Sequence, residues 1–215
     1  MTRLIYVRHG ESNSTVARVI GGHRTCSGLS PLGVLQAEAL RDRWVGAPEF
    51  TPDLILSSQF PRARQTAEIV AQAFGSPEIV VDEGFGEHDP GAECDGMTMA
   101  DFVDRWGTGS WEEDPFGVTF PGGETLAGFH FRIGTAVRRL VDDHADRVIL
   151  ITCHGGVIDT VLRQALKTAP TGSFNIITLN TSITELELSR PNRWSLRRYG
   201  DTAHLRGLPA VTNVD

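Results

Sequence analysis

Residues 4–10 read LIYVRHG, a short apolar run that ends in an arginine, a histidine and a glycine. A buried strand usually ends in turn residues. This one ends in Arg8 and His9, two side chains that can take part in catalysis. The stretch therefore raises the question of whether the rest of the chain brings matching side chains to the same place.

Apolar runs alternate with amphipathic stretches along the whole sequence. Strands are expected at residues 4–7, 53–56, 78–81, 147–152, 174–179, 182–188 and 194–199. Helices are expected at residues 32–44, 61–74, 122–145 and 155–166. This alternation predicts an α/β protein with three layers, α/β/α, and a mostly parallel central sheet with one antiparallel edge strand. We expect one domain over residues 1–206, an irregular lid insertion at about 84–121 and a loose tail at 207–215.

The composition disfavours several classes of protein. The chain has 215 residues, 40% of them hydrophobic, which suffices for one sizeable core. A formal net charge of -7 argues against a nucleic-acid partner. No apolar run approaches the roughly 20 residues that span a bilayer, and none near the N-terminus has the length of a signal peptide. Three cysteines, Cys26, Cys94 and Cys153, indicate reduced thiols, so we expect a cytoplasmic protein.

Three of the predicted strands end in residues that suit an anion. The first ends in Arg8 and His9, the second precedes SSQFPRARQTA with Arg62 and Arg64, and strand 147–152 precedes CHGG with His154. Ligands of open α/β sheets bind at the carboxyl ends of strands, where helix N-termini also favour negative charge. Each signal alone is more typical of a turn or a solvated helix face. Together they predict an anion site at one edge of the sheet.

Six sequence blocks carry a wider resemblance. In chain order they read VRHGESN, SSQFPRARQTA, GEHDPGAECDGMT, FPGGET, ITCHGG and NTSITEL, and they span about residues 3–188. This ordered set resembles the signature of the histidine phosphatase superfamily, in the branch that contains the cofactor-dependent phosphoglycerate mutases. The resemblance implies that His9 is the nucleophile and forms a phosphohistidine intermediate. It also implies that Arg8 and Arg62 clamp the phosphoryl group, that His154 hydrogen-bonds it, and that no metal or other cofactor takes part.

The same resemblance implies an acidic residue that gives a proton to the leaving oxygen and later takes one from water. Glu87 matches this position, with Glu83 and Asp89 as alternatives, because the loop between Gly91 and Asp95 is one residue longer than the common pattern.

A second departure from the family pattern concerns the phosphate contacts. The family often has an asparagine four residues after the glutamate of the first block, and here that residue is Thr15, with an asparagine at Asn13 instead. Either Thr15 or Asn13 is expected to contact phosphate, and Gly155 is a further candidate phosphate ligand.

The lid composition favours a phosphatase over a mutase. Residues 88–131 hold one basic residue, Arg105, with nine acids and seven large aromatic residues. Such a lid suits an apolar leaving group better than a second anionic group, although the aromatics could instead form the core of the lid. Trp106, Phe120 and Glu124 are the candidate pocket residues. If basic residues came from elsewhere, we expect them among Arg24, Arg193, Arg197 and Arg198.

The sequence therefore predicts a metal-independent phosphomonoesterase that acts on a small phosphorylated metabolite. A cofactor-dependent phosphoglycerate mutase is one alternative, and a catalytically silent phosphate-binding interaction protein is another. We expect a small-molecule phosphomonoester as the partner, with no nucleic acid and no membrane, and the sequence leaves a homodimer open.

Overall fold

The computed structural model describes residues 1–107, 114–117, 120–171, 174–191 and 193–209. Its strands are β1 (Thr2–Arg8), β2 (Leu54–Ser57), β3 (Ile79–Val81), β4 (Val148–Cys153), β5 (Ile183–Arg190) and β6 (Arg193–Asp201). Its α-helices are α1 (Asn13–Ala17), α2 (Pro31–Gly46), α3 (Pro61–Ala71), α4 (Gly91–Cys94), α5 (Met99–Trp106), α6 (Leu126–Asp143) and α7 (Gly155–Leu166). Three 3₁₀ turns lie at Gln72–Phe74, Glu83–Phe85 and Ala203–Leu205.

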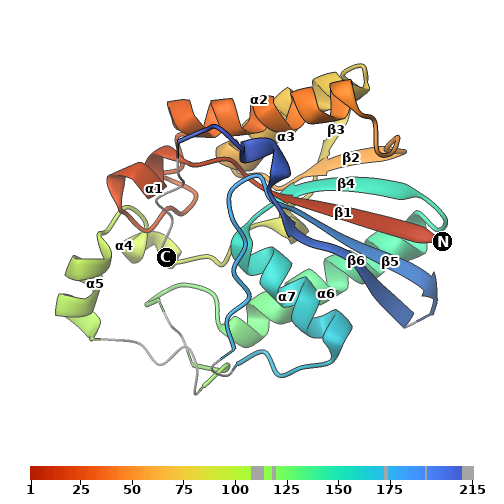
Figure 1. The fold of residues 1–215 in the computed structure, drawn as a ribbon. Coiled ribbons are helices and arrows are strands. Elements are labelled where there is room, and N and C mark those ends of the chain that lie inside the picture. The colour runs from red at the N-terminus through yellow and green to blue at the C-terminus, as the bar shows by residue number, and fades with distance from the viewer. Residues whose placement is uncertain (108–113, 118–119, 172–173, 192, 210–215) are drawn as a thin grey trace.

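One sheet with the strand order β3-β2-β4-β1-β5-β6 forms the middle layer. Strands β1, β2, β3 and β4 pair in parallel, whereas β5 pairs antiparallel with β1 and β6 antiparallel with β5. Helices α2 and α3 cover one face of the sheet, and α6 and α7 cover the other (Figure 1). The predicted three-layer α/β/α fold is confirmed, with the antiparallel edge made by the β5–β6 pair.

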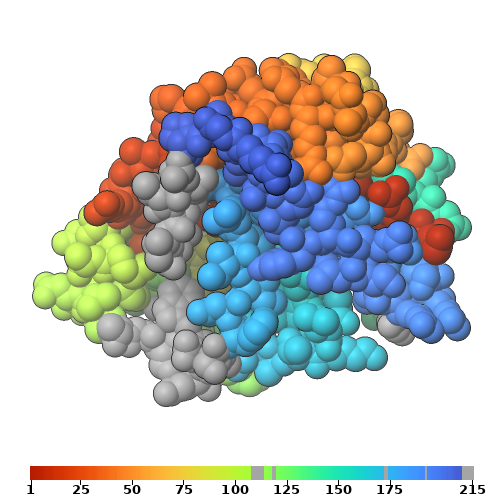
Figure 2. Space-filling view, in the orientation of Figure 1, coloured from red at the N-terminus to blue at the C-terminus, as the bar shows by residue number. Residues whose placement is uncertain are grey.

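The two faces of the sheet bury alternate residues of the central strands. Leu4 and Tyr6 belong to the core under α6 and α7, whereas Ile5 and Val7 belong to the core under α2 and α3. Successive side chains of a strand point to opposite faces, so a strand covered on both sides reads as one continuous apolar run. Residues 4–7 are at most 1% exposed, and on the face shown in the space-filling view the red atoms at the surface lie near the N-terminus and around α1 (Figure 2).

Polar caps set where the helices begin. Helix α2 starts at Pro31, and the side chain of Ser30 accepts a hydrogen bond from the backbone of Gly33. Helix α6 starts at Leu126, not at the predicted residue 122, because Thr125 caps it by accepting from the backbone of Gly128.

Two expectations about local structure need correction. Residues 174–179 form no strand. Their carbonyl groups accept hydrogen bonds from side chains instead of from a neighbouring strand, since the Arg8 guanidinium donates to the carbonyl of Thr178 and the Tyr199 hydroxyl donates to the carbonyl of Ile177. The insertion at 84–121 is not wholly irregular, since it contains α4 and α5. Of the predicted loose tail, residues 210–215 lie outside the described residues.

Two further findings bear on the composition. Cys26, Cys94 and Cys153 are free and buried. Among the helices that the structure describes, none is long and apolar enough to cross a membrane.

Candidate active site

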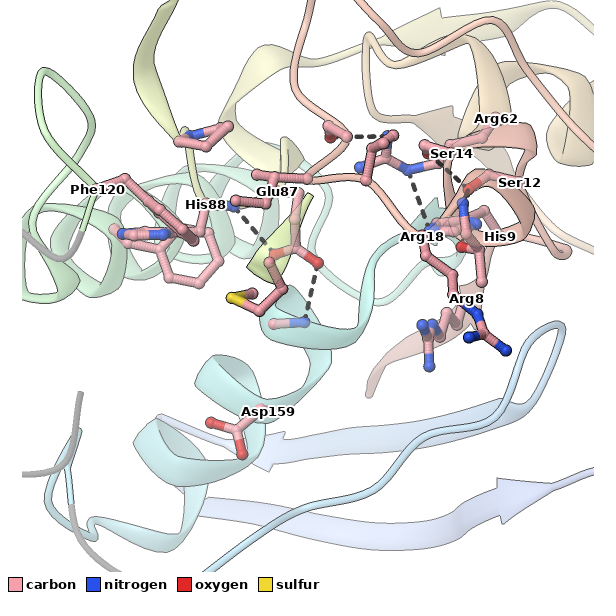
Figure 3. Close-up of a pocket in the computed structure, with 18 of the residues that line it drawn as sticks. Arg8, His9, Ser12, Ser14, Arg18, Arg62, Glu87, His88, Phe120 and Asp159 are labelled. Carbon is pink, nitrogen blue, oxygen red and sulfur yellow. Dashed lines mark hydrogen bonds between the residues drawn. The ribbon is translucent and has the colours of Figure 1, made fainter. Parts of the chain in front are cut away.

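A cleft of about 1260 Å³ lies at the carboxyl ends of β1 and β4. Its walls are the segment that follows β1, the start of α3, the loop around Glu87 and the inward faces of α6 and α7 (Figure 3). This is the edge at which the predicted strand ends meet.

His9 lies at the bottom of the cleft and is only 5% exposed. Its Nδ1 lies 2.7 Å from the carbonyl oxygen of Gly10, and its Nε2 accepts a hydrogen bond of 3.1 Å from Nε of Arg62. A ring that donates through Nδ1 keeps a lone pair on Nε2. Burial, then the charges of Arg62 and Arg8, lower the pKa of His9 well below its usual value. The structure therefore holds His9 as a neutral imidazole with its Nε2 lone pair at Arg62.

Two arginines stand beside His9. Arg62 is 4% exposed, its guanidinium carbon lies 4.5 Å from the ring centre of Phe60, and its Nη1 donates to the carbonyl of Gly21 at 3.2 Å. Arg8, the last residue of β1, also lines the cleft. Arg64 is exposed and lies outside the cleft lining, so only Arg62 of the predicted arginine pair reaches the site. Arginine donors in a fixed geometry suit the oxygens of a phosphoryl group.

His154 is fully buried behind His9, with the two ring centres 5.1 Å apart. Its Nε2 lies 2.8 Å from the hydroxyl of Ser58. Burial lowers the pKa of His154 well below its usual value, and the nearby charges of Arg62, His9, Arg8 and Arg132 add to this. Sequence analysis missed the contact with Ser58, although Ser58 is the second residue of the block that contains Arg62 and directly follows β2.

Glu87 is the one of the three candidate acids that lines the cleft. One carboxylate oxygen accepts from the backbone of His88 at 3.0 Å, and the other accepts from the backbone of Gly156 at 3.1 Å, in the first turn of α7 (Figure 3). Glu83 is exposed, and Asp89 accepts from the backbone of Gly91 at 2.9 Å instead. Helix α7 thus orients the Glu87 carboxylate.

The predicted phosphate contacts separate into two groups. Thr15 lines the cleft, whereas Asn13 is exposed and donates to Ser27 Oγ at 3.2 Å, outside the lining. A Cβ at Gly155 would lie 3.6 Å from Nε of Arg8, so this glycine sits close to the arginine. Ser12 and Ser14 also line the cleft, and sequence analysis missed them. Their position just after the RHG turn was the available signal.

Three of the six described aromatic residues between 88 and 131 pack on one another. Phe102, Phe120 and Cys94 form a small core, with Trp106 packed against it. Phe120 also lines the cleft, whereas Trp106 does not. Phe116 and Phe131 are exposed, and Trp111 lies outside the described residues.

The predicted pocket residue Glu124 has a different partner. It forms a two-point ion pair with Arg132, with distances of 3.0 and 2.8 Å, and lies outside the cleft lining. The candidate basic residues Arg24, Arg193, Arg197 and Arg198, all in the described part of the chain, are likewise absent from the lining. The basic residue that sequence analysis missed is Arg18, which does line the cleft.

Asp95 joins the lid to the phosphate end of the cleft. Its buried carboxylate accepts from the backbone of Gly22 at 2.9 Å, from the backbone of Arg24 at 2.6 Å and from the hydroxyl of Thr25. These hydrogen bonds lower the pKa of Asp95 despite the opposing effect of burial. They fix the loop whose Gly21 carbonyl holds Arg62.

Within the described residues, no group of three or more His, Cys, Asp or Glu side chains is placed to hold a metal ion.

Comparisons with known proteins identify the family of this chain. The family model of the histidine phosphatase superfamily (branch 1) matches residues 4–202. Phosphoglycerate mutase-like protein 4 of Arabidopsis thaliana is 29% identical over 94% of this chain and 86% of its own length. The metal-independent phosphoserine phosphatase of the same plant is 26% identical over 95% of this chain and 84% of its own length.

Solved structures show the same fold. A mutant phosphoserine phosphatase from Entamoeba histolytica, in complex with phosphoserine, is 25% identical with a TM-score of 0.77, over 95% of this chain and all of the other. A mycobacterial glucosyl-3-phosphoglycerate phosphatase in complex with VO3 is 26% identical with a TM-score of 0.77, over 92% of this chain and 98% of the other. The chain belongs to the histidine phosphatase superfamily, among phosphatases and mutase-like enzymes.

Proposed function

We propose that the protein is a metal-independent phosphomonoesterase that acts on a small phosphorylated metabolite through a phosphohistidine on His9. The observation that carries this proposal is the buried, neutral imidazole of His9, whose Nε2 lone pair lies beside Arg62 at the bottom of the cleft. A neutral imidazole is a nucleophile, and a covalent intermediate divides one difficult displacement into two easier steps.

The first step transfers the phosphoryl group to His9. Nε2 attacks phosphorus, the bond to the leaving oxygen breaks, and Glu87 in its acid form gives its proton to that oxygen. Arg8, Arg62 and the buried His154 stabilise the negative charge on the phosphoryl oxygens.

The second step returns the enzyme to its starting state. A water molecule attacks the phosphorus of phosphohistidine, Glu87 takes one proton from it, and the bond to Nε2 breaks. Inorganic phosphate leaves, and His9 is again a neutral imidazole. The cycle uses side chains that line the cleft, together with His154, which is buried behind His9.

Two observations favour hydrolysis over mutase activity. Solved structures of phosphatases match nearly the whole chain at 25–26% identity, although the sequence relatives include mutase-like proteins as well. In addition, the described lid residues place no arginine or lysine in the cleft lining. The mutases that the sequence blocks resemble hold a second anionic group with basic residues that follow the catalytic acid, and they keep water from the phosphohistidine.

The test is hydrolysis of p-nitrophenyl phosphate with and without exhaustive chelation by EDTA. We expect turnover that survives EDTA. Loss of activity with EDTA and recovery with a divalent ion would overturn the metal-independent mechanism. Phosphate binding without turnover would support the catalytically silent alternative, and interconversion of 2- and 3-phosphoglycerate that depends on bisphosphoglycerate would support the mutase alternative.

A further inference from the structure

Arg18 differs from the other charged side chains of the cleft. The acids there each have partners: Glu11 accepts from Ser30, Glu87 from two backbone groups, and Asp159 from Arg163. Arg62 donates to His9, and Arg8 donates to the carbonyl of Thr178. Among the described charged residues of the lining, the guanidinium of Arg18 alone makes no hydrogen bond or ion pair.

The backbone holds Arg18 in a fixed place. Arg18 ends α1 in the left-handed region, with φ 55° and ψ 44°, which is unfavourable for a residue with a Cβ. Its own N–H bonds to the carbonyls of Ser14 and Thr15, and the next residue, Val19, bridges to Thr98 of the lid. Backbone hydrogen bonds therefore fix the chain on both sides of Arg18. The side chain of Arg18 lines the cleft from this fixed position.

Five of the charged side chains that line the cleft are separated along its length. In the view of Figure 3, Arg8, Arg18 and Arg62 gather around His9, whereas Glu87 and Asp159 lie toward the other end. Arg62 and Arg8 lie at His9, where the phosphoryl group must bind. A second negative group would be repelled by the carboxylates at the far end, and it would find a free guanidinium at Arg18.

We propose that Arg18 is a substrate-binding residue that recognises a second anionic group, a carboxylate or a phosphate, on the leaving group of the phosphomonoester. This inference rests on the proposed function, because it places the first phosphoryl group at His9. The enzyme would then prefer small phosphate esters whose leaving group carries a negative charge. The basic residue that recognises this charge is Arg18 and not a residue of the described part of the lid.

The test uses ligand pairs that differ by one anionic group. Phosphoserine and phosphoethanolamine differ by a carboxylate, and fructose 1,6-bisphosphate and fructose 6-phosphate differ by a phosphate. Each is measured as a competitive inhibitor of p-nitrophenyl phosphate hydrolysis, so that a ligand need not itself be turned over. We expect the wild type to bind the more anionic member of at least one pair more tightly, and that pair identifies the anion.

The variant Arg18→Met keeps the apolar stem and removes the charge. We expect it to raise the inhibition constant of the more anionic ligand about tenfold and to change that of its partner by less than about twofold. Arg18→Lys should recover part of the loss. Arg64→Met removes the same charge from an exposed site outside the cleft lining and serves as the matched control, with no effect on any ligand.

Three results would overturn the proposal. One is wild-type binding that does not distinguish the members of either pair. Another is an equal increase in the inhibition constants of both members of a pair in Arg18→Met. The third is a fall in kcat/KM of Arg18→Met for p-nitrophenyl phosphate that is as large as the rise in the inhibition constant of the more anionic ligand. That result would make Arg18 a third ligand of the reacting phosphoryl group. If the wild type hydrolyses nothing, the proposed function fails, and calorimetric titration of the same ligands still decides the role of Arg18.

Discussion

The phosphate end of the cleft and its lid end are built in different ways. At the phosphate end, His9, Arg62 and His154 are at most 5% exposed and are tied to one another or to Ser58. The lid has a small core of its own around Phe102, apart from the two cores that hold the sheet. The catalytic side chains thus rest on the main core of the fold, and the lid is joined to them through Asp95, which binds the loop beside Arg62.

The largest effect that this contrast predicts is at Arg62. Arg62→Met should lower kcat/KM for p-nitrophenyl phosphate about 1000-fold, because a fixed donor to the phosphoryl oxygens is lost. Arg64→Met, two residues along the same helix, should stay within about twofold of the wild type. A similar fall in kcat/KM in Arg62→Met and Arg64→Met would mean that the two arginines act through the net charge of the protein and not through a contact at His9.

Glu87 should show the next largest effect, and that effect should depend on the leaving group. Glu87→Gln should reduce turnover of an alkyl phosphate roughly 100-fold and that of p-nitrophenyl phosphate much less, because nitrophenolate leaves without a proton. Glu124→Gln changes a carboxylate that is ion-paired with Arg132 outside the cleft lining, and it should show no such dependence on the leaving group. If Asp89→Asn gave the pattern instead, the assignment of Glu87 would be wrong.

The same contrast explains how far sequence analysis could go. Apolar runs such as residues 4–7 reveal the strands, and parallel strands bring their carboxyl ends to one edge, so Arg8, His9, Arg62 and His154 could be placed together. Residues 174–179 are rich in apolar and β-branched residues, as strands are, but their carbonyl groups accept hydrogen bonds from the side chains of Arg8 and Tyr199, which no local pattern reveals.

The lid and the rim of the cleft were harder to predict. The partner of Glu124 is Arg132 on α6, and Arg18 lies on a left-handed turn outside any periodic element. Both depend on tertiary contacts that sequence spacing does not encode. The residues that follow strands could therefore be predicted from the strand pattern, whereas Glu87, which lies on a loop, could be named only through the family resemblance.

Asp95 tests whether the two ends of the cleft are coupled. Asp95→Asn replaces one acceptor oxygen with a donor group facing backbone donors, which should lower the free energy of unfolding by about 1–3 kcal/mol. Because Asp95 fixes the loop that holds Arg62 through Gly21, we also expect kcat/KM to fall about tenfold. The control is Asp104→Asn, at an exposed position of the lid. Lower thermal stability with unchanged kcat/KM would show that the two ends are independent.

The smallest expected effect is a shift in the pH profile. The charge of Arg62 helps to lower the pKa of His9, so its removal should raise that pKa. Neutral His9 is the nucleophile, so the acid limb of kcat/KM in Arg62→Met should move to higher pH than in the wild type. Titration of the substrate is common to both profiles and cancels in the comparison. An unmoved limb would mean that burial and the charge of Arg8 suffice to keep His9 neutral.

The most direct measurement traps the intermediate. Rapid acid-free quenching of the enzyme during turnover of a ³²P-labelled monoester should give protein-bound phosphate that is stable in base, labile in acid and located on His9 by peptide mapping. It should form at least as fast as turnover and be absent from His9→Ala. An acid-stable adduct on a serine, or full activity in His9→Ala, would contradict the central claim that His9 carries the phosphoryl group.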